Sequence, residues 1–318
     1  MVRSTAHFIS YDLRPAKQSE RTILLDLLRL ASDAGLPIKN YRYVGMGANR
    51  FYDFLLMHKY LGITNMVSVE HDPVMFQRAQ FNCPYSFIDV QNTTTEEFIT
   101  SDRFEDPTIV WFDYDGGIGT TIIEDIMSLG TKLKVGDLCF VTVYGGPPGI
   151  LSRKNTTERY EWIKEELGDI GASVLKEDVE NSTFVRAVHK ILVAAFRFAF
   201  AARREGRFSP LLQVKYSDSS PMITVGGGLF ADGTALDLKR RLRDAMTFLD
   251  VQDKTFYEIK SLHLTDRERV LFDLVATRPT RRRRTEINQL KKIGFSDEDI
   301  AAYRDLIRHL PRYVESIV

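Results

Sequence analysis

The chain has 318 residues, of which 44% are apolar and 27% are charged, so a collagen-like, low-complexity or disordered chain is excluded. Its 43 Lys and Arg residues balance 43 Asp and Glu residues, so the net charge does not indicate nucleic acid or a membrane surface as the partner. Cys83 and Cys139 are too few for a disulfide framework and fit a reducing compartment. No segment has the pattern of a signal peptide or a membrane span, so we expect a cytoplasmic protein.

The neutral total conceals two regions of opposite charge. Residues 1–195 hold 20 Lys and Arg against 26 Asp and Glu, whereas residues 196–318 hold 23 against 17. The shift coincides with a change from alternating strand and helix patterns to mostly helical ones. We therefore expect an N-terminal helical lead-in over residues 1–39, a main domain over 40–232 and a helical C-terminal region over 233–318.

The first predicted element is a helix over residues 15–34, whose apolar residues recur at helical spacing. Apolar runs then predict five strands, at residues 41–45, 65–70, 86–90, 108–113 and 138–144. Helical patterns separate these strands, and the segment TTTEEFI carries a Thr-x-x-Glu capping signal. Such alternation predicts an α/β fold with a mostly parallel sheet that helices cover on both faces.

The later part of the chain departs from this alternation. Two helical patterns, at residues 156–168 and 184–204, precede strand patterns at 207–216 and 222–230. The turn-rich spacer between these strands predicts an antiparallel hairpin at one edge of the sheet. Beyond about residue 235 only helices are predicted, at residues 236–249, 266–276, 286–293 and 297–317.

A glycine turn follows the first predicted strand. Glycines at 45 and 47 let the backbone approach a ligand, and the next helix offers N–H groups at its start. Gly-x-Gly alone is equally typical of a tight turn. The second strand, however, ends in Glu70, 23 residues after Gly47, where a carboxylate can bind ribose hydroxyls. The two features together favour a nucleoside-binding site.

The kind of nucleoside follows from what the turn lacks. A dinucleotide fingerprint requires a third glycine where this chain has Arg50, and no Walker A motif occurs. S-adenosylmethionine (SAM) has no pyrophosphate and needs neither. Over residues 40–230 the chain resembles class I SAM-dependent methyltransferases, and the matching motifs are Val44–Gly47, Ser68–Pro73 and Val110–Asp115.

This resemblance implies a Rossmann-like fold, SAM as the cofactor and methyl transfer as the reaction. The chain is most similar to uncharacterised bacterial O-methyltransferases, which makes oxygen the expected acceptor atom, although the acceptor molecule is unknown. The implied cofactor-binding residues are Tyr43, Gly45, Met46, Gly47, Glu70, His71, Asp89 and Asn92. For Asn92 a helix-capping role is an equal alternative, and a structural role is favoured for His71. Because Tyr43 stands where the family usually has an acidic residue, and Asn49 where it has a third glycine, the amino-acid end of SAM must be held in another way.

Asp113, Tyr114 and Asp115 lie at the end of the fourth strand and are the predicted reactive centre, since open parallel sheets bind ligands beyond the carboxyl ends of their strands. Asp115 is the candidate proton acceptor, Asp113 lies nearer the cofactor and Tyr114 shapes the pocket. The alternative is that these carboxylates cap the next helix or support a turn. No metal is predicted, because residues 144–148 supply no further hard ligands after the fifth strand.

Arg14, Lys17 and Arg21 form a basic cluster at the start of the first helix. It could line the substrate cleft and bind an anionic group, but we favour a helix start that is solvated.

The C-terminal region has the outline of a helix–turn–helix over residues 287–307, preceded by Arg281–Arg284. However, the would-be recognition helix begins with carboxylates at 297–299, which phosphate would repel. We therefore favour a helical bundle for packing or for a homodimer. Two alternatives to the enzyme stay open: an inactive nucleoside-binding scaffold or sensor, and a nucleic-acid modifier that uses the basic C-terminal half.

Overall fold

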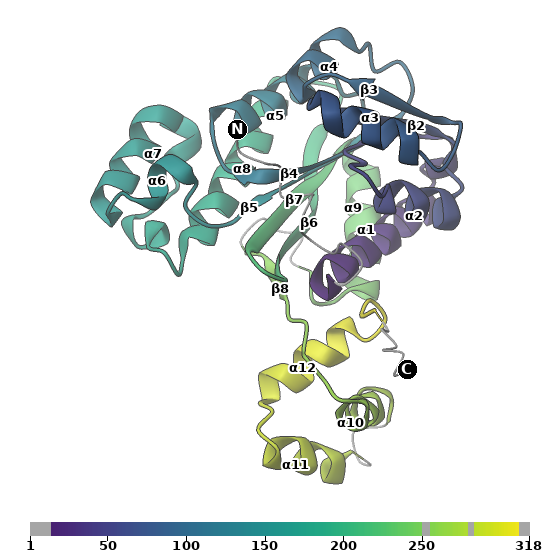
Figure 1. The fold of residues 1–318 in the computed structure, drawn as a ribbon, viewed down its shortest axis with the longest axis vertical. Coiled ribbons are helices and arrows are strands. Elements are labelled where there is room, and N and C mark those ends of the chain that lie inside the picture. The colour runs from purple at the N-terminus through teal and green to yellow at the C-terminus, as the bar shows by residue number, and fades with distance from the viewer. Residues whose placement is uncertain (1–13, 250–254, 279–282, 312–318) are drawn as a thin grey trace.

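The computed structural model describes residues 14–249, 255–278 and 283–311, and its centre is one eight-stranded sheet (Figure 1). The strand order across the sheet is β3-β2-β1-β4-β5-β7-β6-β8. The strands are β1 (Arg42–Gly45), β2 (Asn65–Glu70), β3 (Ile88–Asn92), β4 (Thr108–Gly117), β5 (Leu138–Tyr144), β6 (Arg207–Ser217), β7 (Pro221–Phe230) and β8 (Tyr257–Ile259).

Strands β1 to β5 pair in parallel, and β7 runs antiparallel to both β5 and β6. The predicted α/β fold, with its mostly parallel sheet and antiparallel hairpin, is therefore confirmed. The expectation of helices alone beyond residue 235 is wrong, because β8 pairs in parallel with β6. A strand of three residues is too short to leave a periodic pattern in the sequence.

Helices cover both faces of the sheet. The helices of the described residues are α1 (Pro15–Asp33), α2 (Tyr52–Leu61), α3 (Pro73–Asn82), α4 (Thr95–Ser101), α5 (Thr120–Lys132), α6 (Gly149–Ser152), α7 (Thr156–Gly171), α8 (Phe184–Phe200), α9 (Asp232–Ala245), α10 (Asp266–Thr277), α11 (Arg284–Lys292) and α12 (Asp297–Leu306). One core joins α4, α5, α7 and α8 to one face of the sheet, and a second core joins α1, α2 and α9 to the other. Short 3-10 helices span Ile38–Asn40 and Lys176–Val179.

The alternation of side chains along β4 decides which residues face which layer. Trp111 belongs to the core beneath α1 and Phe112 to the core beneath α5. Because side chains along a strand alternate between the faces, Asp113 follows Trp111 onto the α1 face. Tyr114 follows Phe112 and packs against the opposite core.

Helix α1 is an integral layer of this fold. Its residues Ile23, Leu24, Leu27 and Leu28 are fully buried against the sheet. Asp218, in the turn between β6 and β7, accepts hydrogen bonds from the backbone N–H groups of residues 16 and 17, at 2.9 and 3.0 Å. A carboxylate at a helix N-terminus satisfies unpaired donors and favours the helix dipole. The start of α1 is therefore fixed across the ends of the hairpin strands.

The C-terminal helices α10, α11 and α12 form a separate lobe (yellow-green to yellow in Figure 1) around a small core of their own. Ser296 caps α12 and forms a capping box with Asp299, so the carboxylates here stabilise a helix start, as predicted. The helix predicted over 297–317 ends at Leu306, and Pro311 disfavours helical backbone at Leu310, directly before it. Arg281 and Arg282 lie outside the described residues. Within the described ranges, no helix is both long enough and apolar enough to cross a membrane.

Candidate functional site

The turn after β1 is tightly packed around its two glycines. A Cβ on Gly45 would lie 2.8 Å from the phenol oxygen of Tyr43, and a Cβ on Gly47 would lie 2.6 Å from the ring of Phe51. The N–H of Gly47 donates to the buried Ser68 hydroxyl at 3.0 Å. Side chains of the chain itself therefore require both glycines, whether or not a ligand approaches.

Two other residues of this turn have left-handed backbone. Ala48 has φ 44° and Phe51 has φ 53°, and L-residues adopt this region at a cost of about 1–2 kcal/mol each. The ring of Phe51 is fully buried and packs edge-on against Phe54, at 5.5 Å between centroids. This packing holds the turn in its conformation. Strained turns of this kind are common at ligand sites.

Tyr43 lies in the core beneath the turn. Its side chain is only 1% exposed and packs edge-on against Phe54. Burial, with the negative charge of Asp53, raises its pKa well above the ordinary value for a tyrosine. A neutral, enclosed phenol cannot supply the charge that an acidic residue would supply at this position.

Glu70 ends β2 as a mostly buried carboxylate, with 15% of its side chain exposed. Its Oε1 accepts a hydrogen bond from the N–H of Asp72 at 2.9 Å, and Asp72 in turn caps α3. Burial raises the pKa of Glu70, although the hydrogen bond from Asp72 opposes that shift. His71 points into solvent, with 76% of its side chain exposed.

Asn92 and Asp89 lie in β3 but at different distances from its end. Asn92 ends the strand, and its side-chain amide donates to the carbonyl of Glu70 at 2.8 Å. The helix-capping alternative for Asn92 is wrong, because Thr94 caps α4 through a capping box with Glu97. Asp89 lies three residues earlier, about 10 Å along the strand.

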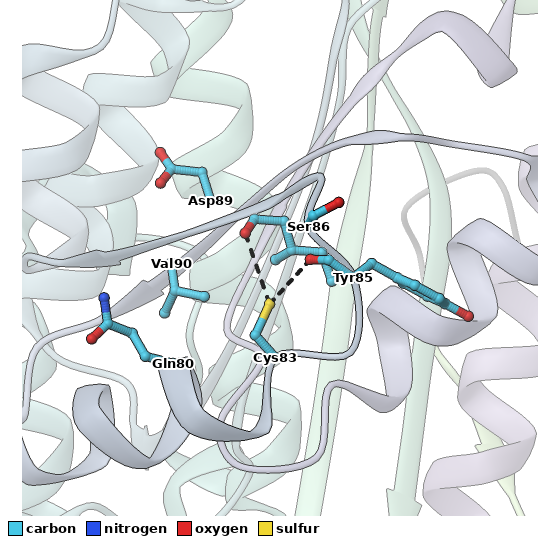
Figure 2. Close-up of a pocket in the computed structure, with 7 residues that line it drawn as sticks. Gln80, Cys83, Tyr85, Ser86, Asp89 and Val90 are labelled. Carbon is cyan, nitrogen blue, oxygen red and sulfur yellow. Dashed lines mark hydrogen bonds between the residues drawn. The ribbon is translucent and has the colours of Figure 1, made fainter.

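Asp89 belongs instead to a pocket at the outer edge of the sheet (Figure 2). The pocket is lined by Gln80, Cys83, Tyr85, Ser86, Ile88, Asp89 and Val90. The Cys83 thiol donates to the carbonyls of Tyr85 and Ile88, at 3.3 and 3.8 Å. The fold therefore separates Asp89 from the end of β2, where Glu70 lies.

The three residues of the predicted reactive centre point in different directions. Asp113 faces α1, with 23% of its side chain exposed, and Asp115 is exposed beyond it. Tyr114 faces the opposite layer, where its hydroxyl donates to Asp125 at 2.5 Å. Burial, together with the charge of Asp125, raises the pKa of Tyr114 well above its ordinary value. The helix-capping alternative for the aspartates is wrong, since Gly119 occupies the N-cap position of α5 and no side chain caps the helix.

A buried cluster of charges lies between α1 and the ends of the strands. The ammonium of Lys17 lies 2.7 Å from Glu20 and 2.7 Å from Asp113, and both Lys17 and Glu20 are fully buried. Beside them, Arg21 pairs with Asp53 of α2 at 2.5 Å. The favoured expectation of a solvated helix start is wrong for Lys17 and Arg21, because α1 lies across the ends of the strands.

Aromatic rings and hydroxyls enclose this cluster. The Lys17 ammonium lies 4.7 Å from the ring centre of Trp111 and 5.3 Å from that of Tyr216, within the range of cation–π attraction. Glu20 accepts a hydrogen bond from the Thr224 hydroxyl. Burial alone would lower the pKa of Lys17, but the charges of Asp113 and Glu20 outweigh it and raise that pKa. Lys17 is therefore a permanent cation next to Asp113.

The sequence contained one signal for this cluster that the local interpretation missed. Lys17 and Glu20 are opposite charges three residues apart, and they continue the helical spacing of the apolar residues Leu24 and Leu27. Their partners Asp113, Asp53 and Thr224 come from three distant elements, so only the fold brings them together. In the described ranges of the chain, no group of three or more His, Cys, Asp or Glu residues could hold a metal ion.

Comparison with known proteins gives one extended match. The model of a family described as "Putative O-methyltransferase" matches residues 9–318. A search of curated proteins found no match.

Several solved structures are similar in fold. The N-methyltransferase NodS from Bradyrhizobium japonicum WM9 aligns with 69% of this chain and 99% of its own, at 13% identity and a TM-score of 0.40. The same protein in complex with S-adenosyl-L-homocysteine aligns with 69% of this chain and 89% of its own, at 13% identity and a TM-score of 0.39. Precorrin 8w decarboxylase from Methanobacterium thermoautotrophicum aligns with 66% and 89%, at 14% identity and a TM-score of 0.34. Because these scores are low, the assignment of the chain rests on the family match.

Proposed function

Since the chain belongs to the "Putative O-methyltransferase" family and is therefore a SAM-dependent methyltransferase, we propose that it transfers a methyl group to an oxygen atom of its acceptor. The proposed site lies at the carboxyl ends of β1, β2 and β4. The single observation that carries this proposal is the family match over residues 9–318. Gly45 and Glu70 end the adjacent parallel strands β1 and β2, and Asp113 lies in β4 two residues beyond the partner of Gly45. These positions support the proposal, because open parallel sheets bind their ligands at such edges.

The groups at this edge fit the parts of SAM. Glu70 offers a partly exposed carboxylate at the end of β2, suited to ribose hydroxyls. The turn from Gly45 to Gly47 follows the adjacent strand β1, and the lack of side chains at its two glycines leaves room for Tyr43, Phe51 and Ser68 of the chain itself. Asp113 adds a second partly exposed carboxylate on the next strand, β4. Met46, His71 and Asn92 lie near this edge. Tyr43 is buried and Asp89 lies three residues before the end of β3, so neither is proposed to bind SAM.

The chemistry asks little of the protein beyond orientation and removal of a proton. SAM supplies a methyl group on a positively charged sulfur. As the acceptor oxygen bonds to the methyl carbon, the carbon–sulfur bond breaks and its electron pair stays on sulfur. The acceptor oxygen loses its proton in this step. Asp115 is exposed, so it can take up this proton and pass it to water.

Equilibrium binding of SAM tests the cofactor site. We expect micromolar affinity for the wild type and a loss of about tenfold or more in Glu70→Ala, because two charge-assisted hydrogen bonds to ribose would disappear. Asp89→Ala is the matched control: it removes a carboxylate from the neighbouring strand and should leave the affinity unchanged. A wild type that does not bind SAM, or equal losses in both variants, would contradict the assignment.

Turnover separates the enzyme from an inactive scaffold or sensor. We would incubate the protein with methyl-labelled SAM and fractionated cell extract, and then follow both S-adenosylhomocysteine and the labelled product. Label that base releases indicates a methyl ester, and ribonuclease-sensitive label indicates RNA as the acceptor. Binding of SAM without any labelled product in any fraction would favour the scaffold. Label on nitrogen would refute oxygen as the acceptor atom.

We also propose that the protein is cytoplasmic and that it forms a homodimer. Cys83 and Cys139 are both free thiols, which supports the cytoplasm as the compartment. Val270 on α10 and Ile293 after α11 are apolar and more than half exposed, which supports a homodimer contact through the C-terminal helices. Light scattering that gives the monomer mass at micromolar concentration would refute the dimer.

A further inference from the structure

The proposed cofactor site leaves one part of SAM without a partner. With ribose at Glu70 on β2 and the glycine turn on β1, the rest of the molecule must extend along the strand order toward β4. That remainder is an amino acid, with an ammonium and a carboxylate. The ammonium needs a negative partner, and the buried phenol of Tyr43 cannot provide one.

The carboxylate of Asp113 lies in β4, two residues beyond the partner of Gly45 and on the face that Tyr43 and Gly45 also share. We propose that Asp113 binds the α-ammonium of SAM and that Lys17 of α1 is the residue that positions Asp113 for this contact. This inference rests on the proposed function, and it names both the contact and the element, α1, that completes the cofactor site.

Burial divides the two roles. Lys17 is fully enclosed and holds Oδ2 of Asp113 at 2.7 Å, so it has no route to a ligand. The Asp113 side chain is 23% exposed, so a ligand can reach its carboxylate from the side away from Lys17. Lys17 thereby orients the carboxylate without taking part in binding.

The surroundings of Lys17 leave it little freedom to move. Trp111 and Tyr216 flank its ammonium, and Glu20 is its second carboxylate partner at 2.7 Å. The backbone N–H of Lys17 donates to Asp218 at 3.0 Å, which fixes the first turn of α1. A cation held from this many sides is suited to orienting a neighbouring carboxylate, because an ion pair directs a carboxylate best when the cation itself is fixed.

Two ligands that differ only at the amino acid test the inference. S-adenosylhomocysteine carries the ammonium, whereas 5′-methylthioadenosine keeps the adenosine and the thioether but lacks the amino acid. In Asp113→Asn we expect the affinity for S-adenosylhomocysteine to fall about tenfold or more and the affinity for methylthioadenosine to stay the same. Lys17→Met should give the same selective loss, and Lys17→Arg should restore most of the affinity.

Asp102→Asn is the matched control, because it breaks a comparably enclosed ion pair, with Arg42, at the start of β1. It should leave both affinities unchanged. If Asp113→Asn weakens both ligands equally, or neither, the ammonium contact is refuted. If Lys17→Arg loses as much affinity as Lys17→Met, the positioning role is refuted. Should Lys17→Met fail to fold, Asp113→Asn and Lys17→Arg still decide the result. A wild type that binds neither ligand would instead overturn the proposed function itself.

Discussion

Gly47 shows at the scale of one residue how the candidate site is built by packing. A methyl group here would lie 2.6 Å from the ring of Phe51 and 2.8 Å from the Ser68 hydroxyl, both of which are fully buried. We predict that Gly47→Ala lowers the free energy of unfolding by about 1–3 kcal/mol, because neither neighbour can yield without moving the turn. Urea unfolding followed by circular dichroism measures this loss.

Gly116 provides the comparison, since a Cβ there would meet nothing within 4 Å. Gly116→Ala should change the free energy of unfolding by no more than about 0.5 kcal/mol. Equal effects of the two substitutions would show that the crowding at Gly47 does not determine the stability of the turn.

The same residues show what local sequence reveals and what it leaves out. The sequence alone predicted that Gly47 and Glu70 belong to one site, because each lies at or just after the end of a predicted parallel strand. The sequence did not predict the burial of Lys17. Its ammonium pairs with Glu20 of α1 and Asp113 of β4, and the rings of Trp111 on β4 and Tyr216 on β6 enclose it. A charged residue near a helix start is usually solvated, and only the crossing of α1 over the strand ends reverses that expectation.

Between elements, one ion pair joins β1 to the end of α4. Both amino groups of Arg42 donate to the carboxylate of Asp102, at 2.7 and 2.8 Å. Burial alone would raise the pKa of Asp102, but the hydrogen bonds and charge of Arg42 outweigh it and lower that pKa below its ordinary value. A carboxylate with a lowered folded-state pKa contributes stability above its unfolded pKa of about 3.9, and loses that contribution as pH falls through the folded value.

We therefore predict that Arg42→Met lowers the free energy of unfolding by about 1–2 kcal/mol at pH 7 and by clearly less at pH 3. Methionine keeps an unbranched apolar side chain and removes the charge, together with its cation–π contact with Phe104. Arg103→Met removes a cation that is 86% exposed, and it should have almost no effect at either pH. If Arg42→Met lowered the free energy of unfolding by the same amount at pH 7 and at pH 3, packing and not charge would link β1 to α4.

Whole elements differ in how well the sequence predicts them. The strands Asn65–Glu70 and Leu138–Tyr144 match their predicted ranges, because each is a short valine-containing segment with apolar residues inside and turn residues around it. β8 was missed, since its three residues become a strand only by pairing with β6. Strand order and the crossing of α1 depend on contacts between distant segments, which a periodic pattern does not contain.

At the scale of the molecule, residues after the predicted domain boundary at 232 complete the core that supports the candidate site. Leu238 and Leu242 of α9 are fully buried in the core beneath α1, and β8 extends the same sheet. The helices α10 to α12, in contrast, have a core of their own. They contact the main body through Leu306 and through His309, whose ring lies 3.1 Å from Asp26 of α1.

A chain ending at residue 232 should therefore lose most of its stability and aggregate, because the inner side of α1 and the outer side of β6 would be uncovered. A chain ending at residue 264 keeps α9 and β8, and we expect it to fold cooperatively with a melting temperature several degrees below that of the full chain. Scanning calorimetry and binding of S-adenosylhomocysteine measure the two effects, and the longer truncation should retain the affinity. If the chain ending at 232 melted like the full chain, α9 and β8 would be accessories; if the chain ending at 264 folded but lost the ligand, the C-terminal helices would belong to the site itself.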